Sequence, residues 1–172
     1  TVDYKYEDLP LSQAQFDIYK IATVNGNGEI KPISPFSYYA LDFSKTDNET
    51  MHSLALTMAS YIARDGIKPY DSAVTDADGK AAFPNNRTGI TRGLYLVIGN
   101  PVSIDGYTYF AETAIIQIPA LDNENNIWDY DVYCGGEWER KRYVVFAGTD
   151  YFDWCAFDTL CGVPFGVYEG TL

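Results

Sequence analysis

The stretch that decides the fold is Thr75-Asp76-Ala77-Asp78-Gly79-Lys80-Ala81-Ala82-Phe83, continued by Thr88-Gly89 and by Gly93-Leu94-Tyr95-Leu96-Val97. Asp76–Gly79 predicts a hairpin turn, because Asp and Gly tolerate the backbone angles that tight turns require. A short strand follows at Ala81–Phe83, and an apolar strand is predicted over Gly93–Ile98. This pattern is typical of a small antiparallel β-sandwich, so we expect a repeated extracellular building block rather than an enzyme.

Further strands are predicted on both sides of this stretch. At the start of the chain, Val2, Tyr4 and Tyr6 alternate with polar residues, which indicates a half-buried strand. The other predicted elements are the turns Asn25–Gly28 and Asp105-Gly106 and the strands Gln15–Ala22, Tyr107–Ile118, Ile127–Tyr133 and Tyr143–Ala147.

One helix is predicted between these strands, over about residues 47–65. Thr46-Asp47-Asn48-Glu49 fits a capping box, in which Thr46 and Glu49 satisfy free backbone N–H groups. Gly66 is a natural C-terminal cap. We expect the helix to pack on a sheet through the apolar residues that recur at helical spacing, Met51, Leu54, Ala55, Met58 and Ile62.

The composition excludes several classes of partner. The chain has 172 residues, of which 47% are hydrophobic, enough to build a core. It carries 24 acidic and 12 basic residues, a net charge of -12, and would repel phosphate backbones and anionic lipids. We therefore expect no nucleic-acid partner. No apolar run reaches the roughly 18–20 residues that a bilayer requires, so no membrane span is expected in this chain.

Five motifs in one order resemble a known family. They are Phe16–Ala22, the capped helix, residues 75–83, Gly93–Val97 and Trp128–Val132. Together they look like the Cna protein B-type domains of Gram-positive sortase-assembled pilins and surface adhesins. The likeness covers about residues 1–133. It implies a mainly β fold, an immunoglobulin-like, prealbumin-like antiparallel β-sandwich with one inserted α-helix.

The resemblance also implies a function and a location. The expected role is that of a structural module, a stalk or shaft subunit of a bacterial surface protein or pilus that serves cell adhesion. The expected location is extracellular, in the cell wall or pilus. The implied partners are neighbouring pilin or surface-protein subunits, a sortase, and a host or glycan ligand. The pilin lysine motif is not evident, since Tyr133-Cys134-Gly135-Gly136 stands where it would begin.

Many members of this family form an internal Lys–Asn or Lys–Asp amide bond, which needs a desolvated lysine beside a protonated carboxyl group. Lys20 shares a strand face with Phe16 and Ile18, and Glu112 shares one with Ile116 in the predicted strand Tyr107–Ile118. Lys20 and Glu112 are therefore the candidates for an internal amide bond or a buried pair. The alternative is that Lys20 lies at a strand end and extends its amine to water.

Residues 134–172 form an aromatic, cysteine-containing extension whose structure the sequence leaves open. Tyr143, Tyr151 and Trp154 could form a ligand patch, because aromatic side chains combine large contact area with low entropy cost. This reading makes the chain an adhesin or a carbohydrate- or protein-binding module. The alternative is that these residues pack against the sandwich. Cys155 and Cys161 could form a disulfide that leaves Cys134 unpaired, or all three could be free thiols.

The sequence shows no pattern for catalysis, metal binding or a cofactor. The only histidine, His52, is far in sequence from Cys155, which thus lacks a basic partner. Asp76 and Asp78 fit a solvated turn, since a calcium loop would need a bidentate Glu in register. We expect no enzyme activity, no catalytic residues, no metal and no cofactor.

Overall fold

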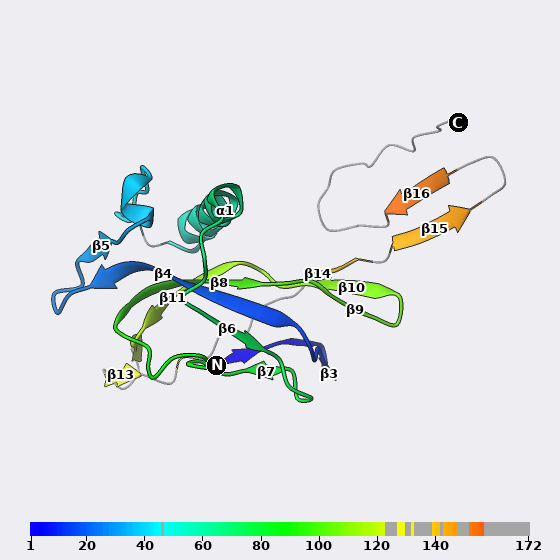
Figure 1. Cartoon of the computed structure of the whole chain (residues 1–172), viewed down its shortest axis with the longest axis horizontal. Coiled ribbons are helices and arrows are strands. Elements are labelled where there is room, and N and C mark those ends of the chain that lie inside the picture. Colours follow the sequence, from blue (N-terminus) through cyan, green and yellow to red (C-terminus); the bar gives the residue numbers. More distant parts are fainter. Residues whose placement is uncertain are drawn as a thin grey trace.

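The largest sheet among the described residues is a five-stranded antiparallel sheet, which we call the central sheet (Figure 1). The computed structural model describes residues 1–45, 47–122, 127–129, 132, 139–141, 143–147 and 152–156. Within them the fold is mainly β, with antiparallel strands and one α-helix, consistent with a β-sandwich. The central sheet has the order β11-β8-β4-β5, with β6 also paired to β4; its strands are β4 (Gln15–Val24), β5 (Ile30–Pro32), β6 (Asp71–Val74), β8 (Gly93–Gly99) and β11 (Ala114–Ile118).

The middle strands β4 and β8 are covered on both faces. Successive residues of a strand point to opposite faces, and β8 is buried from Gly93 to Val97. Leu94 and Leu96 join an apolar cluster with α1, whereas Tyr95 and Val97 join a second cluster on the other face. The apolar strand predicted over Gly93–Ile98 is thus confirmed, as is the strand over Gln15–Ala22.

Helix α1 (Asn48–Asp65) covers one face of the central sheet (Figure 1). Its buried residues are Ala55, Met58 and Ile62, three of the five predicted from helical spacing. Leu54 is partly buried against the same cluster, and Met51 is half-buried. The predicted N-cap is wrong by one residue: Asp47 Oδ1 accepts from the Thr50 N–H at 2.9 Å. Thr46 lies outside the described residues. Thr and Asp both cap helices well, so the sequence alone does not decide which of these two adjacent residues is the N-cap.

The opposite face of the central sheet is covered by residues near the start of the chain. β1 (Val2–Asp3) pairs with β7 (Lys80–Ala81), and β2 (Lys5–Tyr6) pairs with β3 (Leu9–Pro10). The predicted strand at the start of the chain is split at Tyr4. The Tyr4 N–H donates to Gly79 O at 2.7 Å, and its carbonyl accepts from the Leu11 N–H at 2.9 Å. Tyr4 therefore joins three segments instead of continuing one pairing.

The turn Asp76–Gly79 is confirmed. The Gly79 N–H donates to Asp76 O at 3.0 Å, and Asp76 Oδ1 accepts from the N–H groups of Asp78 and Lys80, each at 2.9 Å. The turn at Asn25–Gly28 is confirmed in the same way, since Asn25 Oδ1 accepts from the N–H groups of Asn27 and Glu29. In both turns an Asx side chain replaces backbone partners that the turn leaves free.

The single strand predicted over Tyr107–Ile118 is wrong. β10 (Tyr107–Phe110) belongs to a sheet of order β14-β10-β9, whereas β11 pairs with β8 in the central sheet. β9 (Val102–Ile104) and β10 form a hairpin, and β14 (Glu139–Lys141) pairs with the other edge of β10. The chain passes from one sheet to the other at Ala111–Thr113. Apolar residues precede and follow this connection, so the sequence pattern does not reveal it.

The remaining elements are short pairs. β12 (Ala120–Asp122) pairs with β13 (Ile127–Asp129), β15 (Tyr143–Ala147) pairs with β16 (Phe152–Ala156), and the 3₁₀-helix η1 spans Phe36–Tyr38. β15 coincides with the strand predicted there. β13 covers the first three residues of the predicted strand Ile127–Tyr133, and of the rest only Val132 is described. The division at residue 133 stays a prediction.

Candidate functional site

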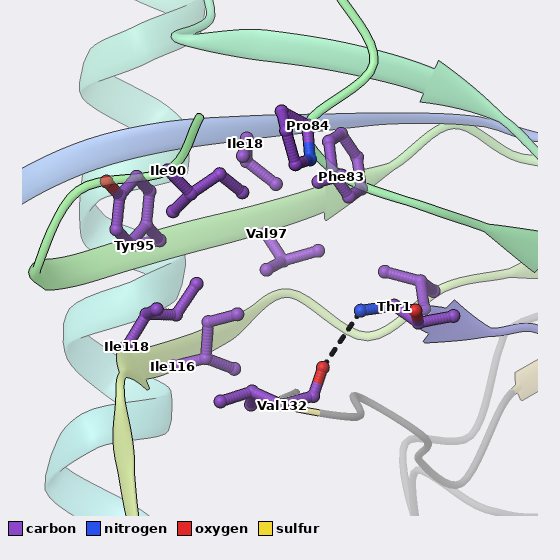
Figure 2. Close-up of a pocket in the computed structure, with 11 residues that line it drawn as sticks. Thr1, Ile18, Phe83, Pro84, Ile90, Tyr95, Val97, Ile116, Ile118 and Val132 are labelled. Carbon is purple, nitrogen blue, oxygen red and sulfur yellow. Dashed lines mark hydrogen bonds between the residues drawn. The ribbon is translucent and has the colours of Figure 1, made fainter. Parts of the chain in front are cut away.

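A cavity lined mostly by apolar side chains lies on the face of the central sheet opposite α1 (Figure 2). It has a volume of about 260 Å³. We call it the sheet cavity, and it is lined by Thr1, Val2, Ile18, Phe83, Pro84, Ile90, Tyr95, Val97, Ile116, Ile118 and Val132.

Three kinds of segment build this cavity. Figure 2 shows side chains from β4, β8 and β11, with Phe83 and Pro84 of the loop between β7 and β8 beside Ile18. The third side is closed where the Thr1 backbone nitrogen donates to Val132 O at 2.8 Å. The first strand and the region after β13, far apart in sequence, therefore meet beside the cavity.

The loop of residues 82–92, here called the cavity loop, is held at one end by Asp71. This carboxylate is only 4% exposed. It accepts from the backbone N–H groups of Asn85 at 2.7 Å, Asn86 at 3.0 Å and Ser72 at 2.9 Å. Burial alone would raise the pKa of Asp71, but these amide donors outweigh it and lower that pKa below its usual value.

Side chains of the cavity loop strengthen the same anchor. The amide groups of Asn85 and Asn86 both donate to Ser72 O, at 2.9 and 2.8 Å. Arg87 Nε donates to Tyr70 O, and the guanidinium lies 4.0 Å from the centre of the Tyr70 ring. The cavity loop thus supplies the donors, and residues 70–72 at the start of β6 supply the acceptors, which fixes Phe83 and Pro84 beside the cavity.

The other end of the cavity loop is held by Thr91. Its hydroxyl accepts from Lys20 Nζ at 2.6 Å, and its carbonyl accepts from the Tyr95 hydroxyl at 2.6 Å. Burial raises the pKa of Tyr95. The Lys20 amine and the Tyr95 hydroxyl therefore both have partners at this end of the cavity.

The structure does not bring Lys20 and Glu112 together. Lys20 lies 5.9 Å from the centre of the Tyr95 ring, on the cavity side of the central sheet. Glu112 Oε1 lies 2.9 Å from His52 Nδ1 of α1, on the helix side. The predicted pairing assumed that Glu112 continues the alternation of β11, but Glu112 lies in the connection between β10 and β11.

The predicted residues of the extension are described only in part. Tyr143 lies on β15, and Cys155 and Trp154 lie on β16, where their backbones are placed. Tyr151, Cys161 and Cys134 lie outside the described residues. The disulfide Cys155–Cys161 and the aromatic ligand patch therefore stay predictions.

Sequence reasoning did not find the residues that anchor the cavity loop. Asp71 begins a short strand, and Asn85-Asn86 follows Pro84, which alone signals only a turn. Asp71 binds the backbone of Asn85, fourteen residues further along the chain, and such a contact produces no periodic pattern in the sequence. The one available signal was the cluster of turn-forming residues at 84–89, which indicated a long loop in need of partners.

The chemistry open to the sheet cavity is narrow. Of its described lining residues, only Tyr95 carries an ionisable side chain. In the part of the chain that the structure describes, no three His, Cys, Asp or Glu residues gather as metal ligands would. Nor does a described helix have the length and apolar character needed to cross a membrane.

No protein-family model matches the chain, and no curated protein matches it significantly.

Proposed function

We propose that the chain is a structural module of a bacterial surface protein or pilus, built as an immunoglobulin-like, prealbumin-like β-sandwich. The observation that carries the proposal is how its motifs meet. The segments at Phe16–Ala22 and Gly93–Val97 form neighbouring strands at the middle of the central sheet. The turn at Asp76–Gly79 leads to β7 in the facing layer, and the capped helix covers the other face.

The hydrogen bonds between distant segments support a mechanical role. Tyr4 joins the first strands to Gly79, and Asp71 joins β6 to the cavity loop. Each of these contacts joins segments that are far apart in the sequence. The sheet cavity, with mostly apolar lining side chains and a Tyr95 hydroxyl that already has a partner, favours a packing role over acid–base catalysis.

The test is where the protein resides and in what covalent form. Antibodies raised against this chain would be applied to intact cells of the source bacterium and to their cell-wall fraction after boiling in detergent. We expect labelled cells and a wall-bound signal at masses above the 19.3 kDa of this chain. A cytosolic protein of comparable abundance serves as the control for cell lysis. A signal confined to the cytosolic fraction would contradict the proposal.

A further inference from the structure

A pair of stacked tyrosine rings joins the end of η1 to α1. Tyr39 directly follows η1, and Tyr61 lies in the last turns of α1. Their ring centres lie 4.4 Å apart, and the ring planes are inclined by only 24°. Both residues are partly exposed. The two rings are therefore in contact with each other and open to a reagent in solution.

The Tyr39 phenol is hydrogen-bonded to a carboxylate. Its O–H donates to Asp65 Oδ2 at 2.5 Å. Arg64 binds both oxygens of the same carboxylate, with Nε donating to Oδ1 at 2.7 Å and Nη2 donating to Oδ2 at 2.8 Å. The hydrogen bonds from Arg64 and Tyr39 lower the pKa of Asp65 to about 2, so it is charged at neutral pH. A charged acceptor for the phenolic proton is therefore already in place.

This contact favours one-electron oxidation of Tyr39. A phenol that loses an electron becomes a far stronger acid, and its proton can pass to Asp65 along the existing hydrogen bond. The Arg64 guanidinium lies 4.8 Å from the centre of the Tyr61 ring and 5.9 Å from that of Tyr39. Its charge opposes a positive charge on either ring, but it does not oppose a neutral radical. Transfer of the proton to Asp65 therefore removes the electrostatic obstacle to oxidation.

Other tyrosine pairs in the described part of the chain lack this arrangement. The rings of Tyr6 and Tyr109 have centres 5.4 Å apart and planes inclined by 58°, and Tyr109 is buried. Those of Tyr70 and Tyr95 have centres 5.6 Å apart and planes inclined by 74°, and Tyr95 is buried. Of these pairs, the one at α1 is the closest and the most nearly parallel, and neither of its rings is buried.

We propose that Tyr39 and Tyr61 are an oxidative cross-linking site, at which a haem peroxidase with hydrogen peroxide joins the two rings by a carbon–carbon bond and Asp65 takes the first proton. Each phenol loses one electron and one proton and becomes a neutral radical. Because the rings are already in contact, the two radicals couple with each other, through the ring carbons next to the hydroxyl groups. The hydrogens on those carbons move to the oxygens, which restores both phenols.

The electron balance closes with the peroxide. One hydrogen peroxide takes up the two electrons and two protons that the rings lose, and becomes two molecules of water. The product fixes the segment after η1 to α1 by a covalent bond. The inference concerns a modification of the chain and is independent of the proposed surface role.

The experiment treats the full chain, at low concentration, with a haem peroxidase and hydrogen peroxide. Trypsin then cleaves after Lys45, between the two tyrosines, and yields peptides of residues 21–45 and 46–64, the second with Tyr61 as its only tyrosine. We expect tandem mass spectrometry to find these two peptides joined, two hydrogen atoms lighter than their sum, in protein that stays monomeric. If the pair stays unjoined under conditions that convert free tyrosine to dityrosine, the proposal is overturned.

Substitutions identify the reacting groups. Tyr38 is the matched control, since it adjoins Tyr39 and is 79% exposed. Tyr38→Phe should leave the yield of the cross-link unchanged, whereas Tyr39→Phe and Tyr61→Phe should each abolish it. Asp65→Asn can still accept a hydrogen bond but is a much weaker base, so it should lower the yield several-fold. A cross-link that survives Tyr39→Phe, or equal yields from the wild type and Asp65→Asn, would overturn the proposal.

Discussion

At the scale of single residues, Gly79 is held by two independent constraints. Its φ is +75°, and a Cβ there would lie 2.3 Å from Tyr4 O. Left-handed backbone costs an alanine about 1 kcal/mol, and the contact must be relieved by moving the backbone of Tyr4. We predict that Gly79→Ala lowers the free energy of unfolding by more than about 2 kcal/mol, measured by urea denaturation.

Two other glycines separate these constraints. Gly106 also has a positive φ, +77°, but a Cβ added there would meet nothing within 4 Å. Gly106→Ala should therefore cost only about 1 kcal/mol. Gly26 has open space and no positive φ, so Gly26→Ala should cause no loss. Equal effects of Gly79→Ala and Gly106→Ala would show that the contact with Tyr4 is unimportant.

Asp71 makes stability depend on pH. Its pKa in the folded protein is lowered, so the unfolded chain binds the proton more readily. Its contribution is therefore present above the unfolded pKa of about 4 and is lost as the pH falls through the folded pKa. We predict that Asp71→Asn, which presents a donor to one of the loop N–H groups, costs about 1–3 kcal/mol at pH about 7.

The measurement is urea denaturation of both proteins between neutral pH and pH about 3. The difference between wild type and Asp71→Asn should shrink as the pH falls, because protonation removes the charge from the wild-type side chain. A difference that stays constant over this range would contradict the assignment of Asp71 as a charged anchor.

At the scale of elements, helix α1 is held by its inner face. Met58 is fully buried against the central sheet, whereas Leu56, two residues earlier, is 48% exposed. We predict that Met58→Ala lowers the free energy of unfolding by about 2–4 kcal/mol, through lost burial and the cavity left behind. Leu56→Ala should change it by less than about 0.5 kcal/mol. Similar losses in urea denaturation would mean that α1 does not dock through this face.

The same scale shows what could be predicted from sequence. Periodicity and turn residues found α1, β4, β8 and the turns at Asn25–Gly28 and Asp76–Gly79, because each depends on neighbours in sequence. They missed the split at Tyr4 and the change of sheet at Ala111–Thr113. Both are decided by partners far along the chain. Val2, Tyr4 and Tyr6 keep one alternation across the split. Tyr109 and Ile116, in contrast, pack on the same cluster although they are seven residues apart, so the phase changes at the second break.

At the scale of the whole molecule, the two faces of the central sheet decide what can meet. Adjacent residues of one strand face opposite layers. Two residues can therefore form a site only if they point to the same face of the sheet, even where their strands are neighbours. The sheet cavity draws Ile18, Val97 and Ile116 from three strands of one face. Ile18 and Ile116 were placed among apolar residues of predicted strands from sequence, but their convergence on one cavity required the strand order.

This separation leads to a prediction for the mass of the protein. Lys20 contacts Thr91 on the cavity side, and Glu112 contacts His52 on the helix side, so this carboxyl group cannot assist amide formation at Lys20. We predict that peptide mapping by mass spectrometry, after reduction of disulfides, recovers the peptides that contain Lys20 in unmodified form. Intact mass measured alongside serves to find any amide bond elsewhere. A deficit of one water or one ammonia that maps to a cross-linked peptide containing Lys20 would contradict this arrangement of the two faces.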